Sequence, residues 1–172
     1  VIPSILSNAC IFLFTIVDGV FVGRGVGSDA LGAVNIAMPV VMIATAINML
    51  TSIGGCAIAA IRLGQNDKEG ANQAFLHSLT ANVVLAAIIT LVCTLLTEPL
   101  SKFLGADAFY LPMVKEYVFW WGLFAIPSAL SVNFQFFCRN DGSPALVAVA
   151  TVISTVLNIF LDWLFVFPMQ MG

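Results

Sequence analysis

Residues 150–167, ATVISTVLNIFLDWLFVF, carry polar side chains at a regular spacing inside an apolar run. At about 100° per residue, a helix would gather four of them into an arc of about 60°: Thr151, Thr155, Asn158 and Asp162. Hydroxyl, amide and carboxylate oxygens are hard ligands that suit a small cation such as sodium. Alternatively, burial raises the pKa of a carboxyl group, which can then load and release a proton near neutral pH. The stripe indicates an ion site, and the residue types leave sodium and protons both open.

Two other apolar runs carry stripes of the same kind. A helix over the first run would place within about 80° the residues Ser4, Asn8, Thr15 and Asp18. The fourth run has a similar stripe of Ser128, Ser131, Gln135 and Arg139. Three such helices would enclose a shared hydrated cavity. We therefore expect the ion-coupling and substrate cavity to contain Asp18, Asn158, Asp162, Thr155, Thr151, Gln135 and Asn8, with possible sodium at Asp18, Asn158 and Asp162.

The two acids also match in depth. Asp18 lies five residues before Gly23, and Asp162 lies six residues before Pro168, each near the end of an odd-numbered run. Odd-numbered spans cross in the same direction, so both acids would sit about 8–9 Å from one membrane face, at 1.5 Å per residue. Charge in the membrane core is costly and usually faces a bundle interior. The alternative is structural: both acids could bond neighbouring helices or reach toward the interface.

The composition places the chain in lipid. It has 172 residues, of which 60% are hydrophobic and 9% charged, against about 25% charged in soluble domains. The net charge of -3 and the absence of a Lys/Arg cluster exclude a nucleic-acid partner. No Ser/His/Asp constellation, metal-spaced His/Cys cluster or phosphate loop is visible, so we expect neither an enzyme nor a cofactor.

Five apolar runs are each long enough to cross a bilayer, which takes about 20 residues. They cover roughly 1–23, 32–62, 75–97, 113–138 and 144–168. Backbone groups in lipid must pair internally, so the spans are helices, and the fold class is an all-α integral membrane protein. The connectors carry three Lys or Arg residues on each side, which leaves orientation undecided. Because the chain starts at Val1 inside a span and stops just after another, we expect a piece of a longer protein.

Three stretches resemble the multidrug and toxic compound extrusion (MATE) transporters. They are VDGVFVGRGVGSDALGAVNIAMP (17–39), Gln135 with FFCRNDGSP (136–144), and LNIFLDWLFVF (157–167). Their order and separation extend over nearly the whole chain. The resemblance is strongest to branches with an acid in the first helix.

The resemblance implies a twelve-helix transporter with two six-helix lobes. Residues 1–172 would then be a partial amino-terminal lobe, with the connectors after the first and third spans external. By motif, Asp18 matches the family's first-helix acid, and Asn158 and Asp162 match its fifth-helix Asn and Asp. The resemblance implies exchange of small organic, often cationic, drugs for sodium or protons, in a multi-pass cell membrane protein, the inner membrane if bacterial. Its partners would be the lipid bilayer and the remaining helices of the same transporter.

We therefore expect a cation-coupled multidrug efflux antiporter that works by alternating access. A rival within the superfamily is a lipid-linked oligosaccharide flippase, which needs a larger and more basic cavity than the one base near the fourth span, Arg139, suggests. Rivals of another class are a channel and a membrane scaffold. A channel would give ohmic ion currents without drug exchange. Loss of a scaffold would remove an assembly partner without any defect in transport.

Overall fold

Helices make up nearly all of the structure, a computed structural model that describes residues 9, 12–13, 16–17, 19 and 27–166. The described part contains helices and turns and no strand. Its helices between residues 28 and 166 are α2 (Ser28–Gly64), α3 (Lys68–Leu95), α4 (Thr97–Phe103), α5 (Leu111–Leu123), α6 (Ala125–Asn140) and α7 (Pro144–Val166). The all-helical class expected from the sequence is confirmed.

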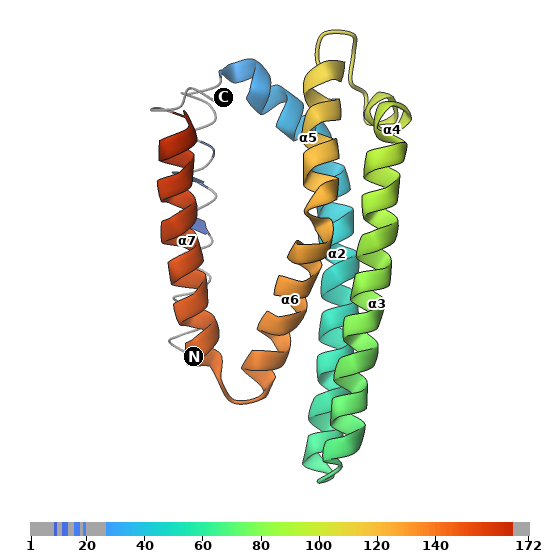
Figure 1. Ribbon diagram of the computed structural model, residues 1–172, viewed down its shortest axis with the longest axis vertical. Coiled ribbons are helices and arrows are strands. Elements are labelled where there is room, and N and C mark those ends of the chain that lie inside the picture. Colours follow the sequence, from blue (N-terminus) through green and yellow to red (C-terminus); the bar gives the residue numbers. More distant parts are fainter. Residues whose placement is uncertain (1–8, 10–11, 14–15, 18, 20–26, 167–172) are drawn as a thin grey trace.

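Two prolines explain where helices end within apolar sequence. The proline ring lacks an N–H and clashes with the carbonyl four residues earlier. Pro99 lies four residues after Leu95, where α3 ends, and Pro127 lies four residues after Leu123, where α5 ends. Pro39 lies inside α2 without ending it, and Figure 1 shows α2 changing direction in the half of the helix that contains this proline.

The fourth apolar run is therefore not one straight helix. The expected range 113–138 is divided between α5 and α6, which meet at Phe124 with a bend of 51°. The Thr90 hydroxyl of α3 donates to the Gly122 carbonyl beside this break, at 2.8 Å. The polar segment 97–112, expected as a connector, also contains the short helix α4.

Among the described residues, α2 and α3 are each long and apolar enough to cross a membrane, and α5 with α6 makes a third span if the bent pair is one crossing. The α7 helix adds a shorter apolar segment, Ala145–Leu161. Figure 1 shows α2, α3 and the α5–α6 pair side by side, while α7 diverges from α6 like the second arm of a V. The described chain is thus a three-rod bundle with α7 at its edge.

Small residues form the interior of the bundle, and large apolar side chains face outward. The buried hydrophobic residues are mostly alanines, such as Ala37, Ala86 and Ala129, whereas Leu50 is 75% exposed. Small residues let helices approach closely where lipid supplies no hydrophobic drive between them. At Gly55 an added Cβ would collide with the Ser78 side chain of α3.

A buried junction of polar side chains joins α2, α3 and α6. Asn82 of α3 accepts a hydrogen bond from the Thr51 hydroxyl at 2.7 Å and donates to the Ser52 hydroxyl at 2.9 Å. Asn133 of α6 donates to the Ser78 hydroxyl at 2.9 Å and more weakly to Ser52 at 3.4 Å. We call Thr51, Ser52, Ser78, Asn82 and Asn133 the polar junction.

Two buried amide oxygens, those of Asn48 and Asn133, have no hydrogen-bond partner among the described residues. Asn48 lies one helical turn before Ser52 on α2 and is 5% exposed. A buried polar atom that lacks a partner costs free energy, whereas a paired one stabilises the fold. The Asn48 side chain should therefore lower the stability of the fold, whereas the Asn82 side chain should raise it.

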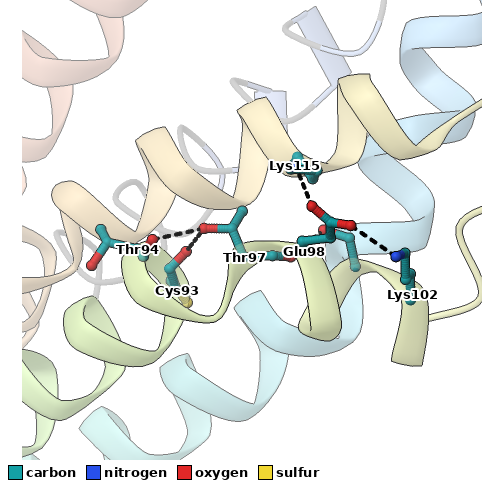
Figure 2. A network of polar contacts seen from close by, with 7 residues as sticks. Cys93, Thr94, Thr97, Glu98, Lys102 and Lys115 are labelled. Atoms are coloured by element: carbon teal, nitrogen blue, oxygen red, sulfur yellow. Dashed lines mark hydrogen bonds and ion pairs between the residues drawn. The ribbon is translucent and has the colours of Figure 1, made fainter.

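A charge clamp holds α4 against α5. Figure 2 shows Glu98 between Lys102 of its own helix and Lys115 of α5. Its two carboxylate oxygens lie 2.8 Å from Nζ of Lys102 and 2.9 Å from Nζ of Lys115. Its hydrogen bonds to the two lysines lower the pKa of the Glu98 carboxyl to about 2 from an ordinary 4.5. The clamp fixes the turn that leads from α3 into α5.

We predict that replacing Asn82 and Asn48 by leucine in the full-length protein will have opposite effects on stability. Asn82→Leu removes the hydrogen bonds that join α3 to the Thr51 and Ser52 hydroxyls of α2, and it should cost about 1–3 kcal/mol. Asn48→Leu removes an unpaired oxygen and should leave stability unchanged or higher. Thermal unfolding in detergent measures both, and an equal loss in the two variants would contradict this account of the junction.

We predict that the Glu98 clamp contributes stability that disappears in acid. Because the folded pKa is lowered, the contribution is complete above about pH 4.5 and is lost as the pH falls toward 2. The melting temperature of the wild type should exceed that of Glu98→Gln slightly at pH 7, and the gap should narrow at pH 3 and in high salt. Glu69→Gln, which removes an exposed acid outside any ion pair of the described residues, is the control. A gap that does not depend on pH would exclude the clamp as its cause.

Candidate functional site

A groove of about 470 Å³ is lined by residues of α6 and α7, the two helices that diverge from each other in Figure 1. From α6 it receives Ser131, Phe134 and Gln135, and from α7 the side chains Thr151, Ser154, Thr155 and Asn158. The rest of its described lining is apolar, and none of the described lining residues carries a formal charge. The groove is therefore an apolar cleft with one row of neutral oxygens and amides on each wall.

Helical periodicity brings the polar side chains of α7 to one wall of the groove and those of α6 to the other. The α7 helix begins at Pro144, at the first helical position where proline is expected. Helical spacing from there brings Thr151, Thr155 and Asn158 to the same face. On α6, Ser131 and Gln135 are separated by one turn and face the groove together.

Two hydroxyl groups of the walls donate their protons to backbone carbonyls of their own helices. Thr151 donates to the Val147 carbonyl at 2.8 Å, and Ser131 donates to the Pro127 carbonyl at 2.9 Å. Within the described part of the chain, Gln135 and Asn158 make no side-chain hydrogen bond. The hydroxyl oxygens therefore keep lone pairs for a guest, and the two amides can both donate and accept.

The structure thus brings together four of the seven side chains expected in the cavity: Gln135, Thr151, Thr155 and Asn158. Asp162 lies on α7 one turn beyond Asn158, and the structure describes its backbone but not its side chain. Asn8 and Asp18 lie outside the described residues. Among the residues that are described, no group of three or more His, Cys, Asp or Glu could hold a metal. The proposed ion ligands Asp18, Asn158 and Asp162 stay a prediction.

The polar junction is the feature that the sequence analysis missed. Its signal was present, because Asn48 and Ser52, and also Ser78 and Asn82, are polar pairs four residues apart in apolar helices. That is the spacing that singled out Asn158 and Asp162. Asn133 has no such neighbour on α6, so its partners are visible only in three dimensions.

A protein-family model described as MatE matches residues 3–164 of the chain. The FAD transporter of Shewanella oneidensis is 28% identical over 170 residues, which cover 96% of this chain and 36% of that protein. The multidrug export protein MepA of Staphylococcus saprophyticus is 24% identical, over 99% of this chain and 38% of that protein. The chain therefore spans little more than a third of the length of these relatives.

Solved structures of similar fold point to the same family as the family model. One is described as an outward-facing conformation of a multidrug resistance MATE family transporter of the MOP superfamily. It is 27% identical with a TM-score of 0.89, over 98% of this chain and 37% of that one. A structure of MATE in the straight conformation has a TM-score of 0.91 at 27% identity, over 99% of this chain and 38% of that one.

We predict that the groove is wet in the full-length protein, whereas the opposite side of α7 faces lipid. Ser154 lines the groove, and its neighbour Ile153 is exposed but does not line it. In a background without native cysteines, Ser154→Cys should react with a membrane-impermeant cationic thiol reagent about tenfold faster than Ile153→Cys, because thiolate forms in water and not in lipid. Equal rates of labelling would show that α7 does not separate water from lipid in this way.

Proposed function

This chain belongs to the MatE family, and we propose that it forms most of the amino-terminal lobe of an ion-coupled drug antiporter in the cell membrane. Relatives named as multidrug export proteins support the export of drugs. The chain covers only part of their length, so the complete transporter would need the remaining helices of the same protein. The partners proposed for it are organic cations, the bilayer, and sodium or protons as the coupling ion.

The observation that carries the proposal is the row of oxygens along the groove wall of α7. Thr151, Thr155 and Asn158 face one cleft, and helical spacing continues their row to Asp162. Neutral oxygens beside a carboxylate can bind sodium directly. The same carboxylate can instead take a proton, because a poorly hydrated site raises its pKa. Both ions neutralise one negative charge.

This neutralisation would couple ion to drug. A cationic drug gains from an ionised Asp162 and loses that gain when sodium or a proton is bound there. Ion and drug would therefore exclude each other at the site, as antiport requires. A ligand shifts a conformational equilibrium only through its different affinities for the two states, so the ion must bind the outward and inward states unequally.

The chemistry of the groove favours a neutral or cationic guest over an anion. A relative of this chain is named as a FAD transporter, and FAD carries two phosphate groups. Phosphate recognition relies on Arg, Lys or clustered backbone N–H groups, and the described lining of the groove offers no Arg or Lys. For the same reason we place a lipid-linked oligosaccharide, which carries a diphosphate, behind a drug.

We predict that Asp162→Asn in the full-length protein abolishes ion coupling. Dye efflux from vesicles, driven in separate experiments by a sodium and by a pH gradient, should fall by about tenfold or more, the scale of a typical coupling free energy. The gradient that drives the wild type identifies the ion.

Asp141→Asn is the matched control, because it removes the same charge from an exposed turn between α6 and α7. Its efflux should equal that of the wild type. Undiminished efflux with normal ion dependence in Asp162→Asn would refute the coupling role.

A further inference from the structure

A second cavity, of about 700 Å³, lies between the first turns of α2 and the length of α5. Its lining is mostly apolar and aromatic, and it has a carboxylate from each helix. The residues that give it this character are Asp29, Glu116, Tyr117, Trp120, Trp121 and Phe124. None of them lines the groove between α6 and α7, so this corner cavity is a separate site.

The aromatic side chains share one face of α5. Tyr117, Trp120 and Phe124 follow each other at intervals of three and four residues, which is the helical repeat. Tyr110 packs against α2 at Gly32, where an added Cβ would come within 2.9 Å of the ring. That contact holds the start of α5 against α2 and keeps the aromatic face opposite the first turns of α2.

The two carboxylates carry negative charge that no described residue compensates. Asp29 and Glu116 are exposed and take part in none of the ion pairs of the described chain. Lys115, the cation next to Glu116 in sequence, is paired with Glu98 (Figure 2), with 2.9 Å between its Nζ and Oε2 of Glu98. The described lining of the cavity contains no Lys or Arg. A guest in this cavity would meet aromatic faces and two negative charges.

Aromatic faces attract cations through the ring quadrupole, and carboxylates do so directly. A cavity of this size, mostly apolar with a few convergent polar groups, has the general form of a small-molecule site. An anion would be repelled, and a small hydrated metal ion would gain nothing from the indoles. We propose that the corner cavity binds a lipophilic organic cation with aromatic substituents, at a site distinct from the groove.

The position of Phe124 gives this binding a structural consequence. Phe124 lines the cavity and is also the residue at which α5 and α6 break, with a bend of 51°. A ligand against its ring touches the joint beyond which α6 carries Gln135 into the groove. Occupancy of the corner cavity can therefore bias the angle of the groove wall without contact with the groove.

The test uses tetraphenylphosphonium and tetraphenylborate, which match in size and shape and differ in the sign of their charge. In the full-length protein without native cysteines, Met113→Cys places a thiol in the lining of the cavity. Tetraphenylphosphonium should slow labelling of this thiol by a maleimide, and tetraphenylborate should not. Phe103→Cys, which is 87% exposed and outside the cavity, should be labelled at the same rate with either ion.

Two sets of variants assign the protection to the named side chains. Adding Asp29→Asn with Glu116→Gln should raise the half-protecting concentration of tetraphenylphosphonium by about tenfold or more. The matched pair Glu69→Gln with Asp141→Asn removes two exposed charges elsewhere and should not change it. Trp120→Leu should weaken protection, and Trp120→Phe should largely restore it, because phenylalanine keeps an aromatic face.

Equal protection by the two ions, no effect of the paired neutralisation, or no reaction of Met113→Cys at all would overturn the proposal. Protection is measured at equilibrium without an ion gradient, so Asp162→Asn should leave it intact. A failure of the corner cavity is thereby distinguishable from a failure of ion-coupled export.

Discussion

The polar junction is the interaction on which the rest of the described structure depends. In lipid the hydrophobic effect does not drive helices together, so close packing and interhelical hydrogen bonds must hold the bundle. Asn82 and Asn133 supply those bonds between α3, α2 and α6. Each of these side chains is fully buried, and an apolar surrounding makes an unmade hydrogen bond costly. The junction therefore fixes the register of three helices at one level.

This register also determines the orientation of one groove wall, because one face of α6 packs in the bundle and another lines the groove. Ala125, Ala129 and Asn133 are buried against α2 and α3, whereas Ser131 and Gln135 line the groove. Positions two residues apart on a helix point about 200° apart, so the bonds of Asn133 to Ser78 and Ser52 determine where Gln135 points. The α7 helix is not held by this network and lies at the edge of the bundle. The polar junction therefore fixes the α6 wall of the groove, whereas the described contacts of α7 with α6 lie outside this network.

The sequence predicted the α7 stripe because all its members lie on one helix. Thr151, Thr155 and Asn158 share a face by helical spacing alone, and the structure brings them to one cleft. The break at Phe124 was also readable in principle, since Pro127 clashes with the carbonyl four residues earlier and kinks or ends a helix there. The expected single span over 113–138 did not take Pro127 into account, because it was drawn from hydropathy, which does not depend on backbone N–H groups.

The junction and the corner cavity could not be derived in the same way. Their residues come from helices far apart in sequence. In the junction, 55 residues separate Asn133 from Ser78. In the corner cavity, Glu116 and Asp29 line the same space because α5 packs on the start of α2. Single-helix periodicity identifies a polar face but not what the face meets. The same limit applies to Asp18 and Asp162. The alternation of spans predicts that both acids lie at a similar depth in the membrane, but it does not predict the distance between their carboxylates.

The distribution of charge connects the groove and the corner cavity. The described lining of the groove is neutral, and two acids that pair with no cation among the described residues, Asp29 and Glu116, line the corner cavity. Lys115 would neutralise that corner if it were free, but Glu98 holds it on the α4 side. A cation in the corner cavity would meet both negative charge and aromatic faces. In the function that we propose, the neutral groove would bind its guest by shape and hydrogen bonds, and the carboxylate expected at Asp162 would hold or release a positive charge. The corner cavity would add a second site for cations on the other side of the break at Phe124.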